Sequence, residues 1–400
     1  MLKILQVVAY YVPAWGYGGP PKVMYGMAKA LAKREHEVTV YTTDAHDGTR
    51  RVETRLRNLD SIKVVYHRNL SNSLAWKKKK FIPMGFPLSL MKNIENFDLV
   101  HIADTRTIPN FVAGYFARKT AVPYVISPFG GLLGGYGTKL KMFAKKKVDE
   151  YFTRPLFLGA DKVLAQTQHE ESVAVEFGIK REKVEQLPLG IDLDEFADIE
   201  SRRNEFRERF GVSPEEKIVL FLGRIHEYKG LQLLVRAFAT VSRSVKNARL
   251  VIAGRDDGYL TAIEDLVRDL GLASKTVVTG ALYGDERIAA YVDADVFAIT
   301  PYHYEETSLA ALEACACGTP VVVTDQCSFP WLKEYEGGYV INYDVQELAD
   351  CLTKVLSDQE LRNRMGSNAR RMIEQKFDWT RIAARLEEIY LEVLGENRVK

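Results

Sequence analysis

The sequence predicts an α/β protein made of two doubly wound, Rossmann-like domains. Its 400 residues are too many for one ordinary domain and suit two. Short apolar, β-branched runs alternate with longer stretches of helical periodicity, which is typical of parallel sheets covered by helices on both faces. The alternation starts again near Ile218 with a new strand, turn and helix, and this restart indicates a second domain.

The expected strands are short. In the first half they cover residues 3–8, 38–42, 62–67, 99–102, 124–127, 162–166 and 184–188. In the second half they cover residues 218–223, 249–253, 276–279, 296–299 and 321–324. Residues 190–213 between the halves are polar and charged, so we place a hinge near residue 190 and the domains at 1–190 and 191–375.

The last segment, residues 376–400, predicts a helix with one apolar face. Apolar side chains recur at helical spacing at Ile382, Ala383, Leu386, Ile389, Tyr390 and Val393. Such a helix has to bury that face against another part of the chain.

The composition is that of a soluble, globular chain, with 46% hydrophobic and 27% charged residues. No apolar run is long enough to predict a membrane span, and the N-terminus enters a strand pattern without a signal-peptide cleavage region. All four cysteines lie between residues 315 and 351. Their spacing favours buried thiols in a reducing, cytoplasmic compartment, and no His, Cys and Asp cluster predicts a metal site.

The net charge of +2 hides an asymmetry between the halves. Residues 1–190 carry 29 basic and 17 acidic side chains, whereas residues 191–400 carry 26 and 36. The basic side chains cluster in two places, at Lys77, Lys78, Lys79 and Lys80 (the 77–80 run) and at Lys139, Lys141, Lys145, Lys146 and Lys147.

The 77–80 run is followed by the apolar residues 81–86. Basic residues beside exposed apolar ones favour an anionic membrane surface, at about 1 kcal/mol per charge. A solvated face or a mobile loop has the same composition and stays an alternative. Nucleic acid is a poorer fit, because the basic segments lack interleaved aromatic residues and a recognition motif.

Two glutamates, Glu305 and Glu313, stand on either side of an expected helix start. Thr307 or Ser308 is suited to accept hydrogen bonds from the first free N–H groups of the helix, and Gly318 and Pro320 suit its end. A helix N-terminus favours a phosphate, and carboxylates accept hydrogen bonds from sugar hydroxyls. The arrangement suits a nucleotide sugar.

Two further loops follow expected strands. Gly223 and Arg224 come directly after a strand, and Lys229 follows five residues later, so the two cations are spaced to clamp a diphosphate. Gly18 and Gly19 follow the first strand, where bare backbone N–H groups can approach a ligand.

The first half places three more candidates at strand ends. Asp104 lies just past an expected strand that contains His101, and the pair Gly130 and Gly131 follows the next strand. In open α/β sheets, ligands bind outside the C-terminal ends of the strands.

These segments, taken in order, resemble the retaining GT-B glycosyltransferases of family four. The matching runs are Gly18-Gly19, Asp98-Leu99-Val100-His101, Ser127-Pro128-Phe129-Gly130-Gly131, Leu187-Pro188-Leu189-Gly190-Ile191-Asp192, Gly223-Arg224 with Lys229-Gly230, Val251-Ile252-Ala253-Gly254, and Glu305 with Glu313 before Gly318-Thr319-Pro320. They cover nearly the whole chain in family order.

The resemblance implies a GT-B architecture, with two Rossmann-like domains facing a central cleft. Residues 1–190 would bind the acceptor, residues 191–375 the nucleotide sugar, and the C-terminal helix would return to the first domain. The donor is a nucleotide-diphosphate sugar used as co-substrate, the acceptor a sugar or lipid-linked hydroxyl, and no cofactor or metal is implied.

The resemblance also implies site roles. Catalysis would rest on Glu305, Arg224, Lys229 and His101, with Arg224 and Lys229 on the diphosphate and Glu305 near the reacting sugar carbon. Glu313 would bind the ribose. The other donor-binding residues are Gly18, Gly19, Gly223, Thr307, Ser308 and Leu309, and the acceptor-side residues are Asp104, Gly130 and Gly131.

The chain departs from the family pattern at two places. Glu306-Thr307-Ser308 stand where Gly-Phe-Gly is usual, in the part that shapes the donor-sugar pocket, and Ala103 replaces the second His of a His-x-His motif. A nucleotide-sugar 2-epimerase and a non-catalytic nucleotide-sugar-binding subunit stay open as alternatives. The sequence names neither the base, the sugar nor the acceptor.

Overall fold

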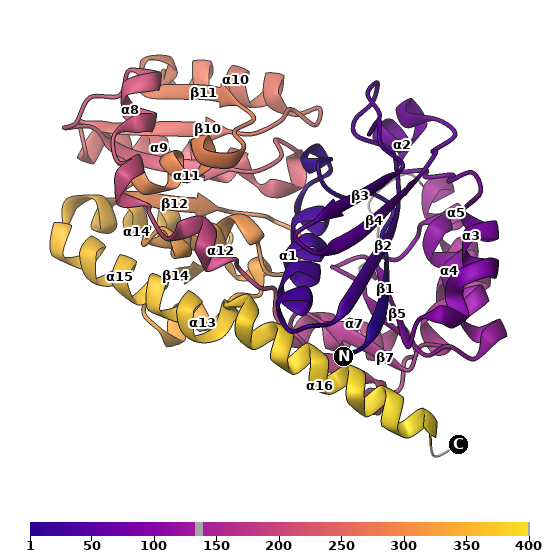
Figure 1. Cartoon of the computed structure of the whole chain (residues 1–400). Coiled ribbons are helices and arrows are strands. Elements are labelled where there is room, and N and C mark those ends of the chain that lie inside the picture. Colours follow the sequence, from indigo (N-terminus) through magenta and orange to yellow (C-terminus); the bar gives the residue numbers. More distant parts are fainter. Residues whose placement is uncertain (133–138, 399–400) are drawn as a thin grey trace. The chain divides into compact units, whose positions relative to one another are not determined.

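The computed structural model describes residues 1–132 and 139–398 (Figure 1). The chain forms two compact units, one of Met1–Gly190 with Trp379–Lys400 and one of Ile191–Asp378. Each unit is built on one mostly parallel sheet with helices packed against it, so the predicted fold class is confirmed. The second unit ends at Asp378 rather than at residue 375.

The first unit contains an eight-stranded sheet in the order β3-β4-β2-β1-β5-β6-β7-β8. Every neighbouring pair is parallel except β3 and β4. The strands are β1 Lys3–Val7, β2 Glu37–Thr43, β3 Leu56–Leu59, β4 Ile62–His67, β5 Leu99–Ala103, β6 Tyr124–Ser127, β7 Lys162–Ala165 and β8 Val184–Gln186.

The second unit contains a six-stranded parallel sheet in the order β11-β10-β9-β12-β13-β14. The strands are β9 Lys217–Leu222, β10 Ala248–Ala253, β11 Thr276–Gly280, β12 Val296–Ile299, β13 Val321–Thr324 and β14 Gly338–Ile341. The side chains of β12 and β13 are buried along their whole length, because helices cover both faces of the sheet.

The sequence pattern missed β3 and β14, which both lie at a sheet edge. The first three residues of β3 are exposed, so it carries no buried alternation that could reveal it. β14 begins with Gly338, where an added Cβ would lie 1.9 Å from the carbonyl oxygen of Val321. The close backbone approach requires glycine, and glycine lowers the apparent strand propensity of the segment.

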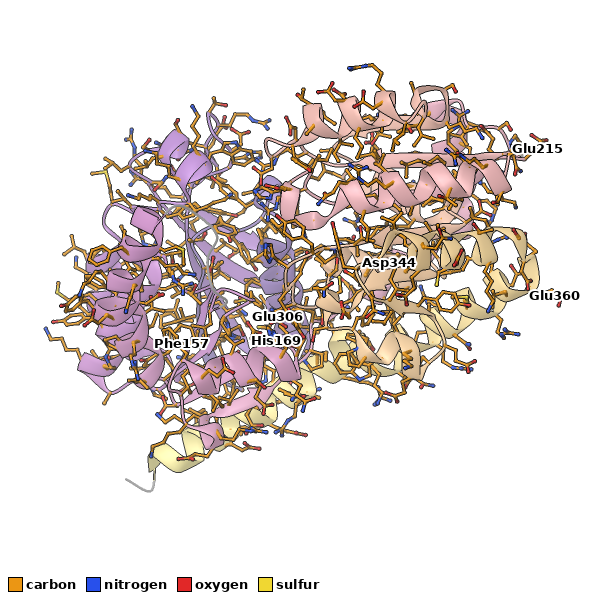
Figure 2. All side chains as sticks on the ribbon, turned by 180° about the vertical axis from the view of Figure 1, so that it is seen from behind. Phe157, His169, Glu215, Glu306, Asp344 and Glu360 are labelled. Atoms are coloured by element: carbon orange, nitrogen blue, oxygen red, sulfur yellow. The ribbon has the colours of Figure 1, made fainter. Side chains whose placement is uncertain are left out.

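The helices complete the layers of each unit. In the first unit they are α1 Gly19–Lys33, α2 Asn72–Lys78, α3 Phe86–Asn93, α4 Ile108–Thr120, α5 Lys139–Val148, α6 Arg154–Leu158, α7 Gln168–Glu176 and α16 Trp379–Arg398. In the second they are α8 Glu205–Phe210, α9 Leu231–Ser244, α10 Leu260–Asp269, α11 Gly284–Asp293, α12 Leu309–Ala316, α13 Pro330–Glu334, α14 Val345–Ser357 and α15 Gln359–Met372. In Figure 2, Phe157 lies in the interior of the first unit, whereas Glu215 and Glu360 project from the surface of the second.

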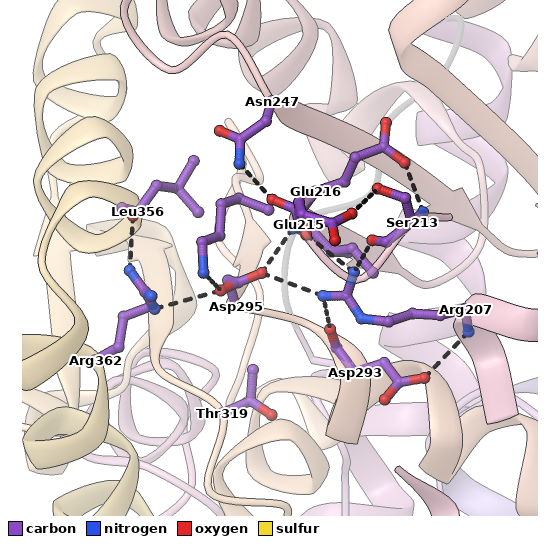
Figure 3. Close-up of polar contacts among 12 residues, drawn as sticks. Arg207, Ser213, Glu215, Glu216, Asn247, Asp293, Asp295, Thr319, Leu356 and Arg362 are labelled. Carbon is purple, nitrogen blue, oxygen red and sulfur yellow. Dashed lines mark hydrogen bonds and ion pairs between the residues drawn. The ribbon is translucent and has the colours of Figure 1, made fainter. Parts of the chain in front are cut away.

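A polar network lies at the start of β12, at the N-terminal edge of the second sheet (Figure 3). The carboxylate of Asp295 lies 3.5 Å from Arg207, 3.4 Å from Lys217 and 3.3 Å from Arg362. Asp293 accepts hydrogen bonds from backbone N–H groups at the start of α8. The network attaches α8 and α15 to the sheet at the edge opposite to its C-terminal loops.

The C-terminal helix α16 packs on the first unit through its apolar face. Trp379 lies over two glycines, and an added Cβ at Gly26 or Gly190 would lie 2.2 Å from its indole ring. The Nε atom of Arg34 in the turn after α1 donates to Glu387 at 2.8 Å. Deep in the unit, the hydroxyl of Tyr390 lies 2.6 Å from Nδ1 of His101.

Replacing Tyr390 by Phe tests how strongly this contact holds α16. The change leaves a buried imidazole nitrogen without its partner, which should lower the free energy of unfolding by about 1–3 kcal/mol. Urea unfolding followed by circular dichroism measures it. Tyr115→Phe is the matched control, because Tyr115 is 54% exposed, and it should change little. Equal losses in the two variants would contradict a stabilising role for the contact.

Candidate active site

The loop after β9 carries the two expected diphosphate-binding cations. It runs from Gly223 through the short 3-10 helix η7 (Glu227–Lys229) to Gly230, where α9 begins. Gly230 has a φ of +68°, and an added Cβ would lie 1.6 Å from the carbonyl oxygen of Thr300. The hydroxyl of Thr300 donates to the Gly230 carbonyl at 3.0 Å. This contact joins the loop after β9 to the loop after β12, and the second loop leads to Glu305.

Lys229 and Glu305 form an ion pair in this structure. The Nζ atom of Lys229 contacts Oε1 of Glu305, and both side chains are largely buried. Burial is the largest single influence and lowers the pKa of Lys229, but the nearby Glu305 and Tyr228, together with the hydrogen bond to Glu305, raise the pKa above its usual value. The second carboxylate oxygen of Glu305 is buried and lacks a hydrogen-bond partner. Glu305 is therefore a charged group that is only half satisfied within its unit.

Arg224 is paired in a similar way. Its guanidinium donates to Oδ2 of Asp257 at 2.6 Å and also contacts the hydroxyl of Tyr228. Burial lowers the pKa of Arg224, while Tyr228 and Asp257 raise it by more. Asp257 lies in the loop after β10, the strand that pairs with β9. The sequence pattern did not single it out, because strand adjacency is invisible in the sequence.

Helix α12 begins and ends close to where the sequence predicted. Gly318 lies just past its end with a φ of +70°. Ser308 holds the N-cap position, but its side chain accepts no hydrogen bond from the helix. Thr307 donates instead to the carbonyl oxygen of Ser328. The predicted side-chain cap of α12 is therefore wrong. The Ser308 side chain does not accept a hydrogen bond from the first N–H groups of the helix, and Thr307 bonds elsewhere.

Glu313 lies five residues into α12 and is buried. Its Oε2 atom lies 3.3 Å from the Tyr291 hydroxyl and 3.2 Å from Nε of Arg287, both on α11. Arg287 also reaches Glu195 at 3.1 Å. These contacts hold the Glu313 carboxylate against α11.

The first unit brings its expected site residues, one for the donor and two for the acceptor, to one edge of its sheet. Gly18, Asp104 and Gly130 each follow a strand, and these strands, β1, β5 and β6, are neighbours. The backbone N–H of Gly130 donates to the buried carboxylate of Glu170 at 2.5 Å. Gly131 is confined by Thr105, whose hydroxyl oxygen would lie 2.4 Å from an added Cβ.

Asp104 is half-buried and has a left-handed φ of +75°. Burial raises the pKa of its carboxyl group, although hydrogen bonds from the Thr105 N–H and the Tyr10 hydroxyl oppose the rise. A strained, desolvated carboxyl group at a strand end is typical of functional sites.

His101 does not fit the catalytic role expected for it. It is fully buried, and its ring nitrogens lie 2.6 Å from the Tyr390 hydroxyl and 2.8 Å from the Ser127 hydroxyl. Burial lowers the pKa of the imidazole to about 3. Because no substrate can reach either nitrogen, we withdraw the catalytic role and assign His101 to the packing of α16.

The surroundings of the 77–80 run also differ from the expectation. Phe81 and Phe86, expected to be exposed beside the lysines, are buried in the first unit. Lys79 lies over the ring of Tyr17 at 4.6 Å and near Trp76. Of the large apolar residues at 81–86, only Met84 is exposed, so the run has little apolar surface next to it.

Within residues 1–132 and 139–398 there is no group of three His, Cys, Asp or Glu side chains placed to hold a metal ion. No described helix combines the length and the apolar character that crossing a membrane requires.

Comparisons with known proteins identify the family of the chain. A family model for glycosyl transferases group 1 matches residues 202–372, and one for a glycosyl transferase 4-like domain matches residues 18–190. An uncharacterised glycosyltransferase of Methanocaldococcus jannaschii is 30% identical over 98% of this chain and 100% of its own length. A D-inositol 3-phosphate glycosyltransferase of Kineococcus radiotolerans is 34% identical over 60% of this chain and 58% of that protein.

Solved structures share the architecture. Anabaena HepE, solved with UDP and glucose, has a TM-score of 0.77 at 20% identity and covers 98% of this chain and 100% of its own. Sucrose-phosphate synthase of Thermosynechococcus elongatus has a TM-score of 0.76 at 19% identity and covers 99% of this chain and 100% of its own. The fold is thus that of the GT-B glycosyltransferases. The chain belongs to the glycosyl transferases group 1 family, of the family-four type.

Gly230→Ala should destabilise the protein by more than the cost of a left-handed alanine alone. A left-handed alanine costs about 1–2 kcal/mol, and the clash with the Thr300 carbonyl adds an overpacking cost of about 1–3 kcal/mol. Gly211→Ala is the matched control, because Gly211 has a φ of +65° and nothing within 4 Å of an added Cβ. Thermal melting should show the larger loss for Gly230→Ala, and equal losses would mean that the loop is not confined.

Proposed function

We propose that this glycosyltransferase moves a hexose from a nucleotide-diphosphate sugar to an acceptor hydroxyl and retains the configuration of the anomeric carbon. The second unit binds the donor and the first unit binds the acceptor. The observation that supports this most is the meeting of Lys229, Arg224 and Glu305 at the C-terminal edge of the second sheet, where ligands of open α/β sheets bind.

Donor binding exchanges internal counter-ions for phosphates. Lys229 leaves Glu305 and Arg224 leaves Asp257, and both cations then contact the diphosphate. The first N–H groups of α12, which Ser308 does not cap, add donors for the same group. Gly223, Thr307, Ser308 and Leu309 line this part of the donor site, and Glu313 binds the ribose.

The exchange releases Glu305 for catalysis. Its carboxylate then stabilises the positive charge that develops at the anomeric carbon. The bond from that carbon to the phosphate oxygen breaks, the acceptor oxygen bonds to the same face, and the departing phosphate oxygen takes the acceptor proton. Arg224 and Lys229 hold the leaving charge, so we propose that the reaction needs no metal cofactor.

The first unit supplies acceptor contacts through Asp104, Gly130 and Gly131, and its Gly18 and Gly19 approach the donor. Relatives indicate the range of acceptors: one is a D-inositol 3-phosphate glycosyltransferase, and another, from Mycobacterium tuberculosis, is a GDP-mannose-dependent phosphatidylinositol monomannoside mannosyltransferase. We propose a sugar or lipid-linked acceptor and a cytoplasmic protein, in agreement with its free and mostly buried cysteines.

A thermal-shift screen across UDP-, GDP- and ADP-sugars identifies the donor. NMR of the product formed from that donor then shows the anomeric configuration, and inversion would contradict the proposal. Conversion of the nucleotide sugar without any acceptor would indicate the alternative 2-epimerase. Binding without turnover of any acceptor would indicate a non-catalytic subunit.

Arg224→Ala and Lys229→Ala should each weaken binding of the nucleoside diphosphate. Losing one charge-assisted contact costs about 1.5–3 kcal/mol, or roughly 10- to 150-fold in Kd. Isothermal calorimetry with UDP, GDP and ADP measures it, with Arg268→Ala as an exposed control on the same unit. Unchanged affinity in both variants would exclude the clamp.

Glu305→Gln and Glu313→Gln should differ in kinetics. Glu313 contacts the nucleotide equally in ground and transition states, so its loss should mainly raise the donor KM. Glu305 acts on charge that develops in the transition state, so its loss should mainly lower kcat, by about 100-fold or more. Steady-state assays with melting curves measure both effects. Identical profiles would mean that the two roles are wrongly assigned.

A further inference from the structure

The outer helices of the first unit expose an unusual amount of apolar surface. Residues 84–158 are less than a fifth of the chain, yet within the described residues they hold ten of the 21 large apolar side chains that are exposed. The largest exposures on α5 and the following π-helix η3 (Asp149–Thr153) are Phe143 at 60%, Tyr151 at 62% and Phe152 at 55%. Apolar groups gathered in this way on a water-facing surface mark interaction sites.

These side chains come from helices that lie together on one side of the first sheet (Figure 1). The ring of Phe152 on η3 packs on the ring of Phe111 on α4, with centroids 5.4 Å apart. Helix α3 packs beside α4, and each of the two helices exposes a further large side chain, Leu88 and Tyr115. The apolar groups therefore form one surface, the α3–η3 face, made by α3, α4, α5 and η3.

The segment that carries this face has an excess of basic residues. Residues 84–158 contain ten Lys or Arg and five Asp or Glu. Of the acids on η3, Asp149 is held by Arg106 at 2.6 Å and Glu150 by Lys147 at 3.0 Å. Lys146 stands four residues after Met142, so an exposed cation and an exposed apolar side chain lie on the same side of α5.

We infer that the α3–η3 face docks on an anionic lipid bilayer. Aromatic and aliphatic groups enter the interfacial layer while lysines meet the lipid phosphates, and the two effects add. A protein partner would satisfy the apolar groups, but it would not by itself account for the excess of lysines around them. In residues 81–86, which follow the 77–80 run, Phe81 and Phe86 are buried and only Met84 is exposed, so docking is assigned to α5 and η3, which expose several aromatic side chains, rather than to that run.

The face is connected to the proposed acceptor loop. Arg106 holds Asp149 of η3 with one edge of its guanidinium and contacts the carbonyl oxygen of Gly131 with another nitrogen. Docking would thus hold the Gly130 and Gly131 loop beside lipid headgroups, which suits a lipid-linked acceptor. This last step rests on the proposed function, whereas the docking itself does not.

Vesicle co-sedimentation tests the inference with the full chain and no nucleotide. The wild type should bind vesicles of phosphatidylcholine with phosphatidylglycerol, bind pure phosphatidylcholine weakly, and lose binding in high salt. Lys146→Glu and Phe143→Ser should each lower the partition coefficient about fivefold or more, since one surface charge contributes about 1 kcal/mol. The controls are Lys78→Glu, in the 77–80 run, and Tyr283→Ser, an exposed aromatic of the second unit, and neither should change binding.

Two outcomes would overturn the inference. Absence of wild-type binding to anionic vesicles is one, and equal losses in the α5 variants and the controls is the other. Light scattering across protein concentrations can show a third contradicting outcome. If the wild type forms a dimer that Phe143→Ser abolishes, and no vesicle binding is seen, the face binds a second copy of the chain instead of a bilayer. Failure of the proposed function would instead show as absent nucleotide binding with vesicle binding intact.

Discussion

The pairing of β9 with β12 is the constraint on which the candidate site depends. It places the loops after these two strands side by side, so that Lys229 and Glu305 meet although 76 positions separate them. Gly230 and Thr300 lock the two loops together through backbone and hydroxyl contacts. Without this adjacency the chain would carry a lysine and a glutamate on unrelated surfaces.

Carboxylates on the loops next to the loop after β9 balance the charges of the two cations. Two buried cations in one place would repel each other and lose their hydration. Each has a carboxylate partner on a neighbouring loop, Glu305 for Lys229 and Asp257 for Arg224. In the function that we propose, an incoming diphosphate would replace charges that are already balanced, and the site would exchange one set of ion pairs for another.

The first unit depends on a different contact, the packing of α16. Trp379 fits over Gly26 and Gly190, and Tyr390 reaches His101 inside the sheet. This role for His101 replaces the catalytic one, and it shows how the same residue type at a strand can serve packing instead of chemistry. A histidine buried with two hydroxyl partners stabilises the fold because both of its ring nitrogens are satisfied.

The sequence by itself determined the α/β class, twelve of the strands and the loops that carry Arg224, Lys229 and Glu305, because periodicity, glycine and charge are local signals. It missed the edge strands β3 and β14, whose side chains carry no buried pattern. Only the tertiary structure decided that Asp257 pairs with Arg224, that His101 is buried, and that Phe81 and Phe86 beside the 77–80 run are buried while α5 and η3 expose aromatic side chains. Strand order and helix packing set these outcomes, and both depend on contacts between residues far apart in the chain.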